Sequence, residues 1–412
     1  MTIINLYHNL FFILIISTVY SAQGLYGFRI SDILVYMIVL LGFFISYKRR
    51  DAVLWLIAFI FLLLALANDF FYFATQVDYS SSLADSEGNI PYDRFLLYLK
   101  YITFLSLPLS MTAFQNNQTY SSKNLIQKNK IKYALILAYF LFIIFLAQQY
   151  LLLYPERLSF PFSNADILWP KKTDAHVLGI TMAFLIAFMQ VMISKKTSIF
   201  QFAINLPGII IMLLTGSSGG VLILLSFYLL YLKPKELFKY FLIILIIFSL
   251  FYVTSIIDPL LGYIADSPMK RALSIPRLIY ENVLTDDINR FTIHQFIISE
   301  LIESNRFISG FGFLGMPFFY YDSFIASLLA PLGIIGLFLF ITFLYLVYKN
   351  NTPYNIEQRR LYRIFVFLFI ISIFISEYHL VVRSYVLMIA CVYYFSNGQD
   401  SLNKVSSSLS TK

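Results

Sequence analysis

The chain is a succession of long apolar stretches, each close to the roughly 20 residues that an α-helix needs to cross a bilayer. Of its 412 residues, 59% are hydrophobic and 13% are charged, whereas soluble domains carry about 25% charged residues. This composition excludes a soluble enzyme, a disordered protein and a fibrous protein. The twelve candidate spans are residues 4–22, 31–47, 52–74, 93–114, 133–153, 175–193, 199–214, 217–232, 240–257, 323–347, 363–377 and 380–396.

We therefore predict an all-α fold, a polytopic helical membrane bundle with about 12 transmembrane helices. Residues 1–396 are predicted to form a single transmembrane domain, and residues 397–412 a flexible cytoplasmic tail. The pairs at 199–232 and 363–396 are short, so each is compatible with two tilted spans or with a re-entrant feature. The single cysteine, Cys391, excludes an intramolecular disulfide and a cysteine-based metal cluster.

The lysines and arginines define an orientation, because cytoplasmic loops carry an excess of them. They concentrate in alternate loops, at residues 48–50, 123–132, 195–196, 233–239 and 349–363, and in the tail. One arrangement, with both termini cytoplasmic, places every short basic loop on the cytoplasmic side. The formal net charge of +8 is therefore an orientation signal and no indication of nucleic-acid binding.

The longest outer loop, residues 258–322, precedes the tenth span and mixes acidic with basic side chains. Within it, apolar residues recur at helical spacing and predict an amphipathic helix over 287–305. At about 100° per residue, Arg290, His294 and Ile297 fall within one narrow arc beside the apolar stripe. Two interpretations stay open: a snorkelling arginine beside a packed histidine, or a cation and a titratable group held over a cavity between the spans.

Residues 214–220, Leu-Thr-Gly-Ser-Ser-Gly-Gly, interrupt the hairpin between the seventh and eighth spans. Such a break leaves the first amides of the next helix free, and a helix N-terminus with glycine beside it favours an anion. The alternative is a tight hairpin whose small residues allow close packing of helices.

Polar residues mark two other outer turns. Asp174 and His176 open the sixth span, where capping of the helix is the alternative to a role with substrate. Glu377, His379 and Arg383 cluster at the last outer turn, and His379 and Arg383 share a helix face. Ionisable groups near membrane depth are functional candidates, and a solvated turn is an equal alternative.

Two further carboxylates have specific interpretations. Asp322 precedes the tenth span, where it can cap the helix, bind sugar hydroxyls or take a proton from an acceptor. Asp69 and Lys100 lie at matching predicted depths on neighbouring spans, so a buried ion pair is their simplest interpretation.

Three features coincide: the long outer loop before the tenth of twelve spans, the glycine/serine break, and a run of spaced motifs. That run is Arg290, Gly310-Phe311-Gly312-Phe313-Leu314-Gly315, Tyr321-Asp322-Ser323-Phe324-Ile325 and Leu332-Gly333-Ile334-Ile335-Gly336. Together they resemble the O-antigen polymerase family of bacterial envelopes, relatives of the O-antigen ligases. The resemblance implies glycan transfer from undecaprenyl diphosphate to a sugar hydroxyl. It also implies a glycosyltransferase at the periplasmic face of the inner membrane, with no metal and no cofactor.

In such a reaction the departing diphosphate needs electrostatic stabilisation, and the attacking hydroxyl needs orientation or a base. The family often carries arginine where this chain has Ser218, so the cation must come from elsewhere. We predict Arg290, whose planar fork suits phosphate, with Arg383 or Arg157 behind it. For the acceptor we predict His294, Asp322 and His176, unranked. The predicted substrate-binding residues are Gly216, Ser217, Ser218, Gly219, Arg157, Asp174, Arg383, His379 and Glu377.

The predicted substrate is an undecaprenyl-diphosphate-linked oligosaccharide, with a chain-length regulator and a flippase as candidate protein partners. One alternative is an O-antigen ligase, which delivers glycan to lipid A-core and usually has a more distinct histidine pattern in its outer loop. The other is a lipid-glycan flippase or transporter. Transporters tend to carry charged or broken spans near the bilayer midplane, whereas polar residues here crowd the outer end.

Overall fold

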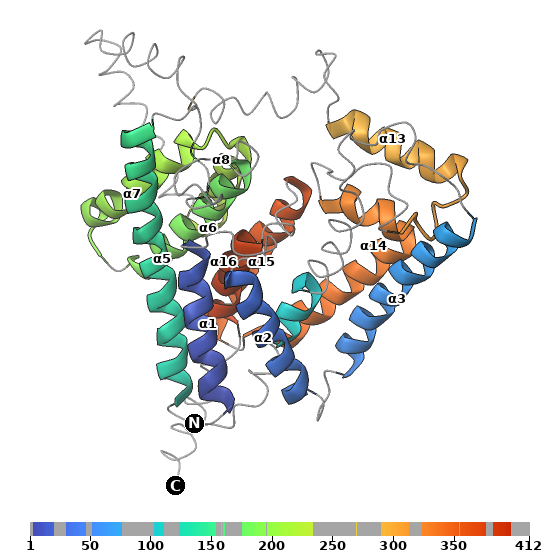
Figure 1. Ribbon diagram of the computed structural model, residues 1–412. Helices are drawn as coiled ribbons and strands as arrows, with labels where there is room; N and C mark the ends of the chain where they lie inside the picture. Colours follow the sequence, from blue (N-terminus) through green and yellow to red (C-terminus); the bar gives the residue numbers. More distant parts are fainter. Residues whose placement is uncertain are drawn as a thin grey trace.

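The computed structural model describes residues 3–19, 30–46, 52–75, 103–110, 123–153, 158, 160, 175–194, 196–233, 269, 290–312, 324–353, 355–375 and 382–396. Every secondary-structure element within these residues is a helix (Figure 1). The labelled helices are α1 (Ile3–Val19), α2 (Ile30–Ser46), α3 (Ala52–Thr75), α5 (Lys123–Leu153), α6 (Ala175–Met192), α7 (Ser198–Leu214), α8 (Ser218–Tyr231), α13 (Arg290–Glu303), α14 (Phe324–Asn351), α15 (Ile356–Ile375) and α16 (Val382–Phe395).

These helices are those of a membrane protein. α3, α5, α6 and α14 contain stretches long and apolar enough to cross a membrane, and α1, α2, α7, α8 and α16 are shorter but apolar. Large apolar side chains lie on exposed faces as well as in the core, as expected where lipid replaces water around a helix. The predicted all-α membrane fold is confirmed, and the number of spans stays a prediction.

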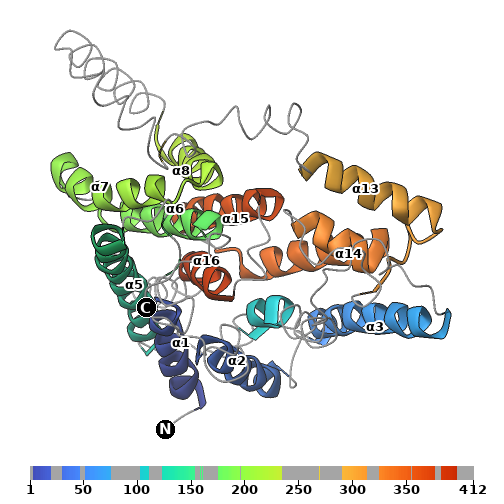
Figure 2. The ribbon, with the colours of Figure 1, turned by 45° about the horizontal axis from the view of Figure 1, so that its top comes forward.

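α16 is the central helix. It packs against α1, α2, α5, α6 and α15, and every side chain from residue 383 to residue 391 is buried. α6, α7 and α8 form one group with α15, while α3, α13 and α14 lie together on the other side (Figure 2). α14 joins the two groups through its contact with α15.

Contacts between helix termini define two ends of the bundle. The starts of α1 and α5 meet where Lys130 Nζ donates to Asn9 Oδ1 (2.7 Å). Arg360, near the start of α15, donates to two carbonyl oxygens at the end of α8 (3.2 and 2.8 Å). Aromatic rings at the end of α16 contact α1, α6 and α15. We call this the basic end, and the opposite end, where α6 and α16 begin and α7 meets α8, the site end.

Most helix boundaries match the sequence prediction within three residues, and the amphipathic helix predicted over 287–305 is present as α13. α5 differs, because it begins at Lys123 and not at residue 133. Its first turns are rich in lysine and asparagine, and their polarity hid a helix that continues beyond the apolar stretch. The predicted spans at 240–257 and at most of 93–114 lie outside the described residues.

α14 was predicted as one continuous span, and this was wrong: it is broken at Gly333, whose φ of 59° and ψ of −163° are not helical. Pro331 contributes, because it lacks an N–H and disfavours a continuous helix. Backbone groups of residues 307–312, which follow α13, take the place of the missing helical partners. The bonds are Phe311 N–H to Ala330 O (2.8 Å), Gly312 N–H to Pro331 O (2.8 Å), Ile334 N–H to Phe307 O (3.0 Å) and Ile335 N–H to Ile308 O (3.2 Å).

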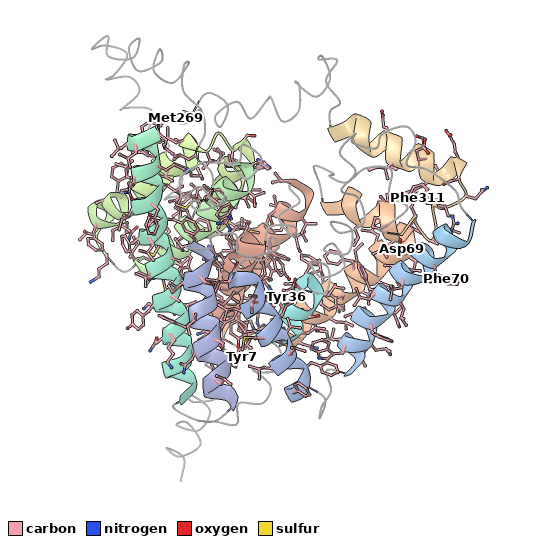
Figure 3. All side chains as sticks on the ribbon, viewed as in Figure 1. Tyr7, Tyr36, Asp69, Phe70, Met269 and Phe311 are labelled. Atoms are coloured by element: carbon pink, nitrogen blue, oxygen red, sulfur yellow. The ribbon has the colours of Figure 1, made fainter. Side chains whose placement is uncertain are left out.

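Two side chains of α3 complete this arrangement. Asn68 Nδ2 donates to the carbonyl oxygens of Ser309 and Pro331. Asp69 is buried against Gly312, where an added Cβ would overlap its carboxylate. Figure 3 shows Asp69 and Phe311 close together where α3 meets α14. We call residues 307–312 and 330–335 with Asn68 and Asp69 the α14 knot; Lys100, the predicted partner of Asp69, lies outside the described residues.

Candidate functional site

The connection between α7 and α8 turns on a left-handed glycine. Gly216 has a φ of 66°, a conformation that favours glycine, and its N–H donates to Leu213 O (2.9 Å). Ser217 then returns to extended backbone and caps α8, because its Oγ accepts a hydrogen bond from Gly220 N–H (3.1 Å). The chain thus reverses within three residues, and α8 begins beside the end of α7.

His176, the second residue of α6, is held against this turn by both ring nitrogens. Its Nδ1 lies 3.2 Å from Ser217 Oγ, and its Nε2 lies 3.4 Å from the carbonyl oxygen of Ile375 at the end of α15. Ser217 Oγ also donates to the backbone carbonyl of His176 (3.0 Å). The imidazole is half-buried, so three helices fix its plane while part of the ring stays accessible.

These contacts suit a histidine that carries a proton on each nitrogen. A carbonyl faces Nε2, which therefore must be protonated to make a hydrogen bond. When Nδ1 is protonated too, it donates to Ser217 Oγ, and the Ser217 hydroxyl hydrogen is left for His176 O. In the neutral ring that hydroxyl hydrogen is shared between Nδ1 and the carbonyl.

Glycines allow the helices to approach one another here. An added Cβ on Gly219 would lie 2.9 Å from His176 Cε1 and 2.7 Å from Ile375 Cγ2, and one on Gly220 would lie 2.6 Å from Gly179 O. Gly179 itself faces Ser217, so a side chain there would overlap the cap. The small residues of this region therefore allow the close packing that one interpretation of the break predicted, and they position the imidazole as well as the backbone. The binding of an anion at the break stays a prediction.

Arg383 lies at the same end of the bundle, at the start of α16. Its side chain is fully buried, and its guanidinium carbon lies 4.6 Å from the centroid of the Phe160 ring, within the range of a cation–π interaction. The next residue, Ser384, has its Oγ 2.5 Å from Thr181 Oγ1 of α6. This polar contact ties the start of α16 to the helix that carries His176.

The amides at the start of α8 differ from one another. Gly220 N–H is capped by Ser217 Oγ, and Val221 N–H donates to Ser217 O (3.3 Å). The amides of Ser218 and Gly219 make no hydrogen bond to any residue that the structure describes. Of the amides predicted to be free, these two therefore have no partner among the described residues. They lie at a helix terminus that carries the positive end of the helix dipole. An anion of phosphate type matches these donors.

The structure brings together part of the predicted site. His176 and the break residues Gly216, Ser217, Ser218 and Gly219 are contiguous, and Arg383 lies at the same end of the bundle. The helix that carries Arg290 and His294 packs beside α14, away from α6 and α8 (Figures 1 and 2). The remaining predicted residues lie outside the described part of the chain: Arg157, Asp174, Asp322, Glu377 and His379.

Sequence reasoning missed three participants: the Ile375 carbonyl, the Thr181–Ser384 contact and the Phe160 ring. Small hydroxyl residues inside apolar spans were the available signal for Thr181 and Ser384, since a buried hydroxyl needs a partner. Nothing in the sequence marks a backbone carbonyl or one phenylalanine among 43. Among the described residues, no group of three histidine, cysteine or acidic side chains could hold a metal ion.

Comparison with known proteins adds no relative to this description. No protein-family model, no curated protein and no solved structure matches the chain significantly.

Proposed function

We propose that this protein polymerises undecaprenyl-diphosphate-linked repeat units of O-antigen, or of a related surface polysaccharide, by glycosyl transfer. The observation that carries the proposal is the site end itself. This end holds a buried arginine, a histidine held by two hydrogen-bonding contacts, and two helix amides that have no partner among the described residues. The sequence motifs supply the resemblance to the polymerase family, and these groups supply the chemistry that such a transfer needs.

The orientation that we propose for the protein in the membrane follows from the charges at the basic end. Lysines and arginines gather there, at the starts of α5 and α15 and near the ends of α6, α8 and α14. Because the cytoplasmic side of membrane proteins carries an excess of basic residues, we assign this end, with the start of α1 and the end of α16, to the cytoplasm. The site end then faces the periplasm of a bacterial inner membrane, where the sugar of a lipid carrier projects from the bilayer.

We assign the stabilisation of the departing diphosphate to Arg383 and to the amides at the start of α8. An acceptor hydroxyl attacks the anomeric carbon, the bond from that carbon to the diphosphate oxygen breaks, and the diphosphate leaves with the electron pair. Arg383 keeps its charge even when buried and offers paired N–H donors to phosphate oxygens. The amides of Ser218 and Gly219 add two neutral donors. Arg290, the first cation that the sequence predicted, begins α13, which packs beside α14 and away from α6 and α8, so it is an alternative to Arg383 and not its neighbour.

We assign the removal of the proton from the acceptor hydroxyl to His176, and His294 and Asp322 are the other candidates for this role. Neutral His176 can receive a proton at Nδ1 through the Ser217 hydroxyl, which passes its own hydrogen to the ring and takes the proton of the acceptor hydroxyl. The imidazolium that results finds hydrogen-bond acceptors at Ser217 Oγ and Ile375 O. Its positive charge then lies beside a departing anion, which it stabilises.

The lipopolysaccharide ladder of a deletion strain tests the proposal. A polymerase deletion leaves single repeat units capped on core, and the full ladder returns with the wild-type gene. Bare core with long carrier-linked chains would identify a ligase, and repeat units retained on the cytoplasmic side would identify a flippase. Either of these results, or an unchanged ladder, overturns the proposal.

Arginine variants in that strain test the assigned residues. Arg290→Ala separates the two cations: loss of long chains at normal protein level would assign the leaving group to Arg290, and unchanged long chains would remove Arg290 from the mechanism. Arg363→Ala is the matched control, because Arg363 is an exposed arginine at the basic end.

A further inference from the structure

Only half of the apolar surface of α13 packs against the bundle. Ile297 and Leu301 are buried, while Ile298 and Ile302 are 40% and 57% exposed. At 100° per residue these four side chains cover an arc of about 140°. Half of the arc faces the bundle, and the other half faces outward.

Beyond the outward isoleucines, the side chains of α13 that the structure describes are polar. Gln295, Ser299 and Glu303 are all exposed, and they follow the outward isoleucines around the helix. α13 therefore has a buried apolar side, an outward apolar side and a polar side, in that order. A helix that rested on the bundle and otherwise faced water would not need the second of these.

The outward apolar side continues onto α14. Ile308, in the loop that follows α13, is 62% exposed, and its carbonyl oxygen accepts a hydrogen bond from Ile335 N–H (3.2 Å). On α14 the exposed apolar side chains then run on through Ile334, Ile335, Phe338, Ile341 and Tyr345. The α14 knot fixes this continuity, since its four backbone hydrogen bonds hold the loop against the broken helix.

The surface of α14 indicates what covers the patch. α14 is one of the helices long and apolar enough to cross a membrane, and over its apolar stretch less than half of the residues are buried. Its exposed apolar side chains therefore face acyl chains. The exposed side chains of α13 lie beside this surface, and Ile308 is held against α14 at Ile335, so they meet the same lipid.

We infer that α13 is seated in the membrane interface, with Ile298, Ile302 and Ile308 inserted among the lipid acyl chains and Gln295, Ser299 and Glu303 turned toward water. This orientation is the one that amphipathic interfacial helices adopt. The partner of this surface is the lipid leaflet at the site end of the bundle. The inference is independent of glycosyl transfer.

Single-cysteine labelling tests this placement. Cys391 is the only cysteine of the chain and is buried, so a new surface cysteine is labelled selectively. Ile302→Cys and Ile308→Cys are the test variants, and Gln295→Cys and Glu303→Cys are the matched controls. Each carries an environment-sensitive nitrobenzoxadiazole dye in the full-length protein, reconstituted at low density in phosphatidylethanolamine/phosphatidylglycerol vesicles.

We expect doxyl-labelled lipid to quench the dye at positions 302 and 308 several-fold more than at positions 295 and 303, and iodide to show the reverse order. A doxyl group near the headgroup is expected to quench more than one deep in the acyl chain. Equal quenching by iodide at all four positions would overturn the inference, because the patch would then face water. Quenching by neither reagent at 302 and 308 would also overturn it, because protein would then cover the patch.

Discussion

Two breaks marked by glycine interrupt the helices, and they are built in opposite ways. At the α7–α8 break, a side chain caps one amide, two amides have no partner among the described residues, and His176 packs against Gly219. At the α14 knot, backbone groups of residues 307–312 pair with those of the broken helix. Asn68 adds two further bonds to carbonyl oxygens. One break leaves donors available, and the other uses them.

The difference teaches how to separate a binding site from a structural joint when the sequence signal is the same. Buried backbone groups need partners, so a break whose groups are paired within the protein gains stability and has little left to offer a ligand. A break whose amides have no partner among the described residues, at the same end of the bundle as a buried cation, can bind an anion. We therefore expect changes at the α7–α8 break to reduce activity, and changes at the α14 knot to reduce stability.

The largest effect is expected from Arg383→Ala. Removing a cation that stabilises the leaving group should lower polymer formation by about 100- to 1,000-fold, and Arg383→Lys should recover part of it because the charge returns without the planar fork. The measurement is the lipopolysaccharide ladder at matched protein level, read beside Arg363→Ala. A normal ladder from Arg383→Ala would assign the buried arginine to packing alone.

Gly312→Ala should have the largest effect on the knot. Gly312 has a φ of 78°, and a Cβ there would overlap Asp69, so strain and overpacking should cost about 2–4 kcal/mol of stability. Thermal unfolding of the purified protein in detergent measures this, with Ser309→Ala as control because Asn68 binds only the Ser309 carbonyl. Polymer made per folded molecule should be unchanged; a selective loss of activity would place the knot in the site.

Gly219→Ala should act mainly on activity. The new methyl group would lie 2.9 Å from His176 Cε1 and displace the imidazole, and a misplacement of about 1 Å can cost roughly 100-fold in rate. Polymer length and amount are the measurement, and Ser226→Ala, farther along α8 and half-buried, is the control. If Gly219→Ala lowers the unfolding temperature as much as Gly312→Ala and leaves the ladder intact, the two breaks are equivalent joints.

Asn68→Ala should have the smallest effect of the four. It leaves the carbonyl oxygens of Ser309 and Pro331 without their side-chain donor, which should cost about 1–2 kcal/mol. Leu66→Ala, an exposed position on the same helix, is the control for truncation alone. Equal unfolding temperatures for both variants would show that the knot does not depend on this amide.

The sequence predicted what is local and periodic. Apolar stretches predicted the helices because lipid requires backbone bonds within each segment, and the spacing within 287–305 predicted α13. The glycine/serine run predicted the break before α8. The sequence did not reveal which distant groups meet there, because Ser217 meets His176 41 residues away and Thr181 meets Ser384 203 residues away. Packing of helices decides those pairs.

The same limit explains why Arg290 ranked above Arg383 in the prediction from the sequence. Arg290 shares a helix face with His294, a pattern visible in sequence, so it ranked first. Arg383 was placed behind it, although Arg383 shares a helix face with His379. Its burial against Phe160 depends on the packing of α16 with its neighbours and has no signal in the sequence.

The central claim is that the site end holds a lipid diphosphate, and binding of undecaprenyl diphosphate to the purified protein tests it most directly. We predict saturable binding to the wild type, binding at least about tenfold weaker in Arg383→Gln, as for loss of one charge-assisted contact, and unchanged binding in Arg363→Gln. Equal affinity in all three proteins, with Arg383→Gln still folded, would contradict the account.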